Sequence, residues 1–434
     1  MIEPEDAEGK REFLRAPGLR GAVVCRTMKL HSGCENPEAF REALMQRGSS
    51  IALSIVTGLA LAANASAADK IKVGYMTTLS GGGATFGMQL KNGFTLGLEH
   101  LGGKLGGLPA EIFLEDDQQK PDVGRQLVDD FIESKKVDVI AGVPWSNIMM
   151  AIYAPVIKSG TILVSSNAGP SPIAGEQCSN HFFSTSWQGD NFAEAMGAHL
   201  QAKGLQNVYL MAPNYQAGKD VLAGFKRFFK GSIAGEVYTP LNQLDYAAEL
   251  AQLRAAKPSA VFAFFPGGLG IQFVTQYSQA GLKASVPLYT SYTIDNTTLP
   301  GIGDTALDVV TTTFWNASID NPANQKFVAA YRAKFNSEPA EYAVQAYDTA
   351  MLLDSGVRGV NGKIEDRDAF AAALAKADFK SPRGKFRYNT NHFPIQDFYA
   401  AQVVRGASGK PEVKLIETVL RDHSDAYAEK CAMK

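Results

Sequence analysis

The sequence predicts an α/β protein built from two lobes, each with a doubly wound parallel sheet. Three observations lead to this fold class. Short apolar segments alternate with helical segments, which indicates βαβ units and parallel sheets. The alternation starts again near residue 207, so a second series follows the first. No low-complexity linker divides the two series, and short crossings that act as a hinge should therefore join the lobes.

Each series can be followed along the chain by its apolar runs and turn residues. In the first series, strands are expected at 71–76, 110–115, 137–141, 161–165 and 182–185, and helices at 86–101, 121–134, 147–158 and 190–202. In the second, strands are expected at 207–211, 235–238, 260–265 and 287–290, and helices at 218–230, 247–256 and 271–280. A mainly helical stretch at 321–376 and two strands at 384–388 and 396–404 complete the prediction.

The N-terminal residues carry the pattern of an export signal. Arg41 and Arg47 precede an apolar run at 51–63, and Ala65-x-Ala67 after it fits a small-residue cleavage site. The run is shorter than the roughly 20 residues that a membrane-spanning helix needs. We expect a leader at 1–44 that results from a misplaced start codon, with Met28 or Met45 as the true start. A signal peptide at 45–67 would then deliver the mature chain to the periplasm.

The cysteines fit an exported protein. Cys25 and Cys34 lie in the part that we expect to be removed, which leaves Cys178 and Cys431 in the mature chain. Because the periplasm is oxidising, a disulfide between them is plausible. Two free thiols are the alternative.

The mature sequence carries little that indicates catalysis. It contains no G-x-S-x-G, H-E-x-x-H, C-x-x-C or G-x-x-x-x-G-K-[ST] motif, and its histidines have no metal-ligand spacing. We therefore predict that the protein is not an enzyme and uses no cofactor and no metal; an exported hydrolase would lack a nucleophile–base pair. The formal net charge of −2 provides no basic surface for nucleic acid.

Small hydroxyl, amide and aromatic residues follow several expected strands. Since ligands bind at the carboxyl ends of strands in open α/β sheets, these residues should face the space between the lobes. The segments are Pro144–Asn147, Ser165–Ala168, Ser186–Gln188, Pro213–Tyr215, Phe265–Gly268 and Ser291–Tyr292. Ser80 stands in a glycine-rich turn before a helix, where it suits a carboxylate or serves a tight turn.

The mature chain resembles the leucine/isoleucine/valine-binding protein family, the type I periplasmic solute-binding proteins of ABC importers. The resemblance rests on IKVGYMTTLSGGGATFGMQLKNGF, AGVPWSNIMMAIYAPVI, ILVSSNAGPSPIAG and QYSQAGLKASVPLY, and the ending NHFPIQDFY resembles the subgroup for aromatic acids. It implies two lobes joined by a three-strand hinge. The first lobe would comprise 68–187 with about 318–380, and the second 188–317 with about 381–434.

The resemblance also implies a monomer that captures a small ligand in the interlobe cleft and delivers it to membrane permease subunits. The ligand-binding residues expected from the resemblance and from the strand ends are Ser80, Trp145, Ser146, Asn147, Ser166, Asn167, Ala168, Trp187, Tyr215, Phe265, Pro266 and Tyr292.

One departure from the family concerns the ligand. Amino-acid binders of this family place a Glu in the second lobe to pair the ligand ammonium, and Leu269 takes that position here. A buried ammonium without a partner costs several kcal/mol. We therefore expect a small carboxylic acid without an ammonium group, an aromatic acid such as a benzoate. A carrier for branched-chain or other amino acids or amides, and a ligand sensor that presents its closed form to a partner receptor, are the alternatives.

Overall fold

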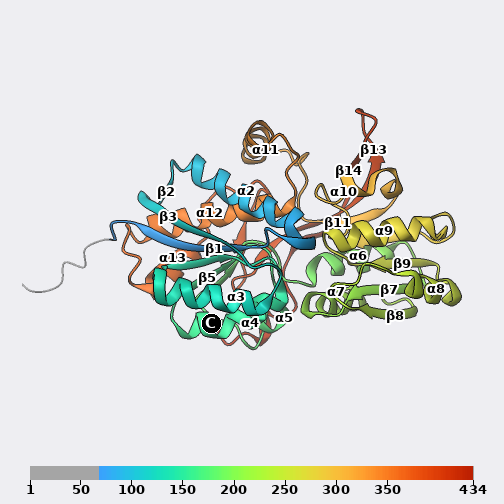
Figure 1. The fold of residues 1–434 in the computed structure, drawn as a ribbon, viewed down its shortest axis with the longest axis horizontal. Helices are drawn as coiled ribbons and strands as arrows, with labels where there is room; N and C mark the ends of the chain where they lie inside the picture. The colour runs from blue at the N-terminus through green and yellow to red at the C-terminus, as the bar shows by residue number, and fades with distance from the viewer. Residues whose placement is uncertain (1–67, 434) are drawn as a thin grey trace, which may run out of the picture. The chain divides into compact units, whose positions relative to one another are not determined.

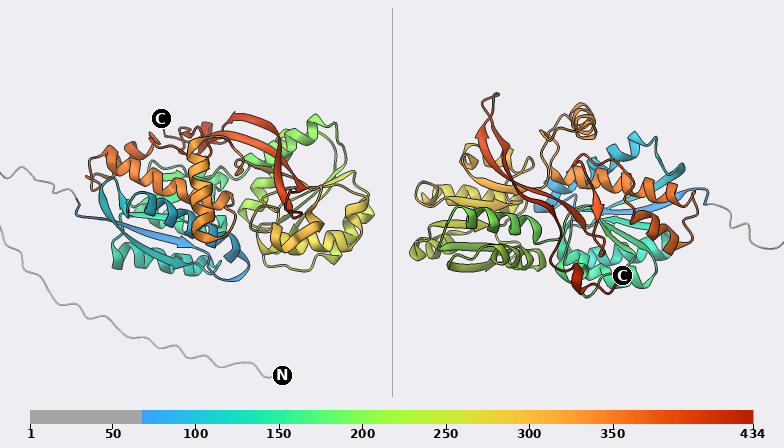
Figure 2. Two further views of the ribbon diagram at one scale, coloured as in Figure 1. Left: turned by 90° about the horizontal axis from the view of Figure 1, so that it is seen from above. Right: turned by 180° about the vertical axis from the view of Figure 1, so that it is seen from behind.

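The structure is a computed structural model that describes residues 68–433. These residues belong to one compact unit and form two sheets with helices around them (Figures 1 and 2). The leader expected at 1–44 and the signal peptide expected at 45–67 lie outside the described residues.

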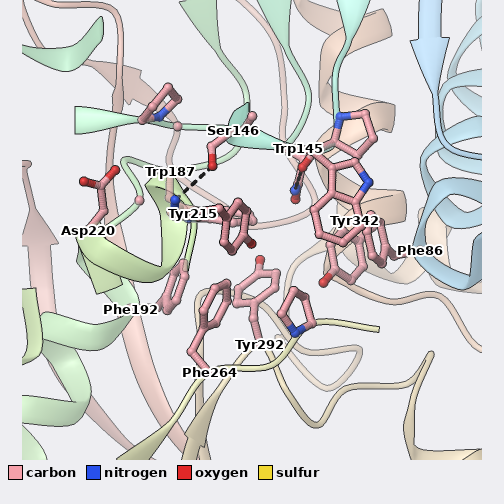
Figure 3. Close-up of a pocket in the computed structure, with 18 residues that line it drawn as sticks. Phe86, Trp145, Ser146, Trp187, Phe192, Tyr215, Asp220, Phe264, Tyr292 and Tyr342 are labelled. Carbon is pink, nitrogen blue, oxygen red and sulfur yellow. Dashed lines mark hydrogen bonds between the residues drawn. The ribbon is translucent and has the colours of Figure 1, made fainter. Parts of the chain in front are cut away.

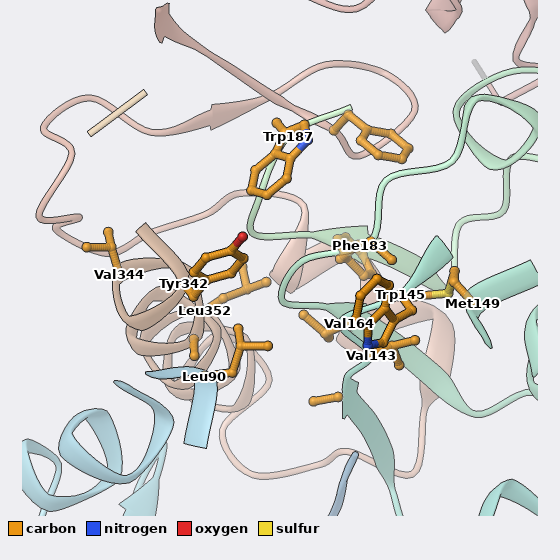
Figure 4. Packing of buried hydrophobic residues seen from close by; sticks show 14 of the residues in the cluster. Leu90, Val143, Trp145, Met149, Val164, Phe183, Trp187, Tyr342, Val344 and Leu352 are labelled. Carbon is orange, nitrogen blue, oxygen red and sulfur yellow. The ribbon is translucent and has the colours of Figure 1, made fainter. Parts of the chain in front are cut away.

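The first sheet has the strand order β2-β3-β1-β4-β5-β6. Its strands are β1 (Ile71–Thr77), β2 (Lys104–Leu105), β3 (Leu108–Asp116), β4 (Val139–Gly142), β5 (Ile162–Ser165) and β6 (Phe182–Ser184). All pair in parallel except β2, which is antiparallel to β3. Because helices cover both faces, β4 and β5 are buried along their whole length. Val164 of β5 belongs to the same buried hydrophobic cluster as Leu90 and Leu352 of the helices that cover the sheet (Figure 4).

The helices of this lobe come from two distant parts of the chain. They are α2 (Ala84–His100), α3 (Pro121–Asp129), α4 (Ser146–Lys158), α5 (Ser171–Ala174), α12 (Glu341–Gly359) and α13 (Arg367–Leu374). α2 and α12 pack together on one face of the sheet, and α3 and α4 lie on the other (Figure 1). A π-helical segment, Asp130–Lys135, extends α3 where a single α-helix is expected.

The second sheet has the order β12-β13-β11-β10-β9-β7-β8, with β14 paired to β13. Its strands are β7 (Val208–Pro213), β8 (Ile233–Thr239), β9 (Ala260–Ala263), β10 (Leu288–Ser291), β11 (Val310–Thr313), β12 (Arg387–Tyr388), β13 (Pro394–Arg405) and β14 (Pro411–His423). Strands β7 to β11 pair in parallel, and β12, β13 and β14 pair antiparallel. The surrounding helices are α6 (Asn191–Ala202), α7 (Gln216–Phe228), α8 (Ala247–Ala256), α9 (Gly268–Gln279) and α10 (Leu299–Ile302).

The chain passes between the two sheets three times before its last strands. It enters the second lobe between β6 and α6, returns between β11 and α11 (Pro322–Phe335), and enters it again between α13 and β13 (Figure 2). After β14 the chain ends beside the first lobe, where Cys431 forms the expected disulfide with Cys178. Two lobes of mostly parallel sheet joined by short crossings confirm the predicted fold class.

Some elements differ from the sequence prediction. No strand is predicted at β11 or β14, and only Arg387–Tyr388 of the strand expected at 384–388 forms one. β14 pairs with β13 alone and is largely exposed, so its polar residues hide the strand pattern. The helix expected at 190–202 begins at Asn191, and the carboxylate of Asp190, which precedes it, does not cap it.

Candidate ligand-binding site

A pocket with a volume of about 40 Å³ lies where the carboxyl ends of strands from both sheets meet. Its wall is largely aromatic (Figure 3). The aromatic lining residues are Phe86, Trp145, Trp187, Phe192, Tyr215, Phe264, Tyr292 and Tyr342. Most of them follow a strand directly, so the parallel sheets themselves bring these side chains together.

Eight of the twelve residues expected to bind a ligand line this pocket. They are Trp145, Ser146, Asn167, Ala168, Trp187, Tyr215, Pro266 and Tyr292. The structure does not bring the other four, Ser80, Asn147, Ser166 and Phe265, into the lining.

Each of these four points elsewhere for a local reason. Ser80 is exposed in its turn, and Asn147 lies one residue beyond Ser146 along α4. Ser166 is buried inside the first lobe, where its hydroxyl lies 2.8 Å from that of Thr349. Phe265 follows Phe264 and therefore projects to the opposite side of the sheet, where its ring stacks on that of Phe273.

The first turns of α4 and α7 face each other across the pocket. The backbone N–H of Ala217 donates to the Ser146 hydroxyl oxygen over 2.9 Å, as the dashed line in Figure 3 shows. Neither N-cap residue, Trp145 or Tyr215, caps its helix with its side chain, and neither helix has an acidic residue in its first turn. Apart from the N–H of Ala217, the N–H groups of the two first turns and the positive ends of both helix dipoles therefore remain available to an anion.

Trp145 is held in the wall by a buried relay of hydrogen bonds. Its indole Nε1 donates to the Thr78 hydroxyl over 2.9 Å, and that hydroxyl donates to Asp117 Oδ1 over 2.6 Å. An indole N–H can only donate, so the direction of the relay is fixed. Burial raises the pKa of Asp117 to about 6.

The pocket wall also includes a carboxylate that the sequence reasoning missed. Asp220 accepts from the Ser171 hydroxyl (2.7 Å), the Ser171 N–H (2.9 Å) and Gln216 Nε2 (2.8 Å). Burial raises its pKa. Leu269, by contrast, lies in the hydrophobic core of the second lobe and is not part of the pocket lining.

Four aromatic lining residues were also missed: Phe86, Phe192, Phe264 and Tyr342. Phe192 and Phe264 follow the crossing and the strand that were already singled out. Because successive side chains of a strand project to opposite sides, only one of Phe264 and Phe265 could face the pocket. Phe86 and Tyr342 lie in the first turns of α2 and α12. No local signal marks Tyr342, because its helix reaches the pocket only through the fold.

Within residues 68–433, no helix is both long and apolar enough to span a bilayer. The same residues contain no group of three or more His, Cys, Asp or Glu side chains placed to hold a metal ion.

The two lobes, with a pocket at the facing strand ends, define a two-lobed solute-binding protein. A family model described as periplasmic binding protein matches residues 70–410, and the chain belongs to this family.

Known relatives agree with this assignment. The Leu/Ile/Val-binding protein homolog 6 of Brucella melitensis is 28% identical over 380 residues, which cover 85% of this chain and 96% of the relative. A solute-binding protein of an ABC transporter from R. palustris, solved in complex with benzoate, is 29% identical with a TM-score of 0.79, covering 84% of this chain and 99% of that one.

Two further solved structures extend the comparison. Another R. palustris solute-binding protein, in complex with 4-hydroxybenzoate, is 28% identical with a TM-score of 0.77, covering 82% of this chain and 98% of that one. A leucine-binding protein from Thermotoga maritima, at 19% identity and a TM-score of 0.72, covers 80% of this chain and 98% of its own and shows the fold alone.

Proposed function

We propose that this protein is the extracytoplasmic solute-binding component of an ABC importer and that its ligand is an aromatic carboxylic acid. The carboxylate binds between the first turns of α4 and α7, and the ring lies among the aromatic side chains of both lobes. The loaded protein then delivers the acid to membrane permease subunits. It acts as a monomer in the periplasm after export through the N-terminal signal.

The observation that carries this proposal is the meeting of the N-termini of α4 and α7 in a pocket lined by aromatic side chains. Ser146 accepts from Ala217, so its own hydroxyl hydrogen is free to donate to a ligand oxygen. Buried aromatic walls favour a flat apolar ring, and a few convergent donors fix its orientation. The benzoate and 4-hydroxybenzoate bound by the two R. palustris proteins support the same ligand class.

The size of the pocket indicates how the ligand enters. An apolar cavity of roughly 150 Å³ holds a benzene molecule, whereas this pocket measures about 40 Å³. The lobes must therefore separate to admit an aromatic ring, and they close on it by bending at the three crossings. A ligand that touches both lobes stabilises the closed state by its differential affinity for it.

Asp220 favours a second candidate, a carrier for amino acids. A carboxylate in the pocket wall could pair a ligand ammonium, and the Brucella relatives are named as Leu/Ile/Val-binding protein homologues. Three donors already bind the Asp220 oxygens, which leaves little room for an ammonium as a further partner. We therefore place the aromatic acid first.

Calorimetry with benzoate, hydroxybenzoates and leucine tests the proposal. An aromatic acid present at 100 times its Kd should also stabilise the protein by about 2.7 kcal/mol. Ser146→Ala should weaken binding of the aromatic acid by roughly tenfold, because a donor to the carboxylate is lost. Ser159→Ala, at the other end of α4, is the matched control. Binding of leucine without binding of aromatic acids would reject the proposal in favour of the second candidate.

A further inference from the structure

Three tyrosine hydroxyls lie among the apolar side chains of the pocket wall, in addition to the polar side chains of Ser146, Asn167 and Asp220. Tyr215 precedes α7, Tyr292 follows β10, and Tyr342 lies in the first turn of α12, so both lobes contribute. Their hydroxyl oxygens point toward the middle of the pocket (Figure 3). A wall built only to hold a bare aromatic ring would not need these polar atoms.

The hydroxyls stay protonated over the physiological pH range. Burial raises the pKa of all three phenols well above the ordinary value near 10. Each hydroxyl can therefore donate one hydrogen bond and also accept one. They act as neutral groups that suit a neutral polar partner.

The hydrogen-bonding capacity of these groups is largely unused within the protein. Tyr292 accepts from Gln345 Nε2 over 3.0 Å, which leaves its own hydrogen free to donate. Among residues 68–433, no protein group forms a hydrogen bond with the hydroxyl of Tyr215 or of Tyr342. A ligand that forms hydrogen bonds with these hydroxyls therefore gains affinity.

Packing fixes where the hydroxyls stand. Tyr215 lies parallel to Phe264 with ring centroids 6.4 Å apart, and Tyr342 stacks on Phe86 with centroids 4.9 Å apart. Tyr292 contacts Trp187 with centroids 4.3 Å apart. With the rings held in this way, the hydroxyls cannot readily turn away from a ligand, and a mismatched ring is penalised.

From this arrangement we infer that the site selects an aromatic acid that carries a hydroxyl on its ring. The ring hydroxyl pairs with Tyr215 and Tyr342, while the carboxylate binds at the Ser146 hydroxyl and the remaining N–H groups in the first turns of α4 and α7. This inference rests on the proposed function. Tyr215 and Tyr342 then determine whether the site prefers a bare or a hydroxylated ring. Since Tyr342 belongs to the first lobe and Tyr215 to the second, the ring hydroxyl also links the lobes in the closed state.

Calorimetry with benzoate and with the 2-, 3- and 4-hydroxybenzoates tests the inference. The unaltered protein should bind at least one hydroxybenzoate about tenfold more tightly than benzoate, as expected for one or two added hydrogen bonds. Tyr215→Phe and Tyr342→Phe keep the rings and remove the hydroxyls. Each should weaken the hydroxybenzoate more than benzoate and bring the ratio of the two dissociation constants close to one.

Tyr347→Phe is the matched control, because Tyr347 lies on α12 with its hydroxyl 2.9 Å from His100 and outside the pocket. It should leave the ratio unchanged. Equal affinity of the unaltered protein for benzoate and every hydroxybenzoate would overturn the inference alone. Equal weakening of both ligands by the two variants would also overturn it, since the tyrosines would then contact the carboxylate. If no aromatic acid binds, the proposed function fails and the inference fails with it.

Discussion

The guanidinium of Arg383 lies 2.8 Å from the carboxylate of Asp348, and both side chains are buried. Arg383 stands in the third crossing between the lobes, and its Nη1 also donates to the carbonyl oxygen of Ser186 in the first crossing over 2.9 Å. The ring of Phe314, at the start of the second crossing, lies 4.8 Å from its guanidinium carbon. One side chain therefore joins all three crossings to α12.

Arg383→Met should destabilise the protein by about 3–5 kcal/mol, because it leaves the carboxylate of Asp348 buried without its partner. The free energy of unfolding, measured by urea denaturation, checks this. Arg358→Met is the control, since the ion pair of Arg358 with Asp354 is half-exposed and such pairs contribute at most about 1 kcal/mol. If Arg383→Met lowers the free energy of unfolding no more than the control does, the assignment of Arg383 to the hinge is contradicted.

The C-terminal residues fasten the two lobes together on the side of the disulfide. Cys431 is joined to Cys178 of the first lobe, and the Tyr427 hydroxyl donates to Asp190 at the start of α6 over 2.7 Å. Removing the disulfide in the double variant Cys178→Ser, Cys431→Ser should lower the free energy of unfolding by about 2–5 kcal/mol. In reducing buffer, the denaturation midpoint of the unaltered protein should fall to the midpoint of the double variant. A variant as stable as the oxidised protein would contradict the prediction.

Most of the fold could be predicted from the sequence because parallel strands buried on both faces leave continuous apolar runs. β4 and β5 are of this kind. β14 could not be predicted, because it is an edge strand whose exposed face carries Glu412 and Lys414 and so shows no apolar run. Predicting it requires knowing that β13 lies beside it.

The site could be predicted in part for a related reason. Trp145, Trp187 and Tyr215 follow strands or the first crossing directly, so a local rule finds them. Tyr342 and Asp220 are brought to the pocket by helix packing between distant segments, which leaves no local signal. Leu269, the position matched by resemblance, lies in the first turn of α9, where its side chain packs into the hydrophobic core of the second lobe.

Ser171 and Asp220 fasten the lobes at the edge of the pocket. Both bonds run from α5 of the first lobe to α7 of the second, so they form when the lobes close. Ser171→Ala removes the bond from the hydroxyl and should increase the dissociation rate of the ligand by roughly threefold to tenfold. Stopped-flow tryptophan fluorescence, with Trp145 and Trp187 as reporters, measures this rate. Ser285→Ala, on the outside of the second lobe, should leave it unchanged; an unchanged rate in Ser171→Ala would show that these bonds do not limit release.

Thr78→Val should weaken ligand binding although Thr78 does not line the pocket. Valine keeps the shape of the side chain but removes the acceptor of the Trp145 indole N–H, which leaves a buried donor unpaired at a cost of about 1–3 kcal/mol. The freed indole should change the tryptophan emission maximum, and calorimetry should show a higher Kd. If the emission and the Kd both match those of the unaltered protein, the relay does not position Trp145.

Asp117 should make stability depend on pH in the acidic range. Its pKa is raised from 3.8 to about 6, mainly by burial, so between these values the native state binds more protons than the unfolded state. The stabilisation that comes from the proton bound at Asp117 is therefore complete below about pH 4 and is lost as the pH rises through 6. Asp117→Asn keeps an oxygen that accepts from Thr78 but cannot titrate. Relative to this variant, the unaltered protein should lose about 3 kcal/mol of stability between pH 4 and pH 7. Urea denaturation at several pH values measures the difference, and a constant difference would show that Asp117 does not titrate in this range.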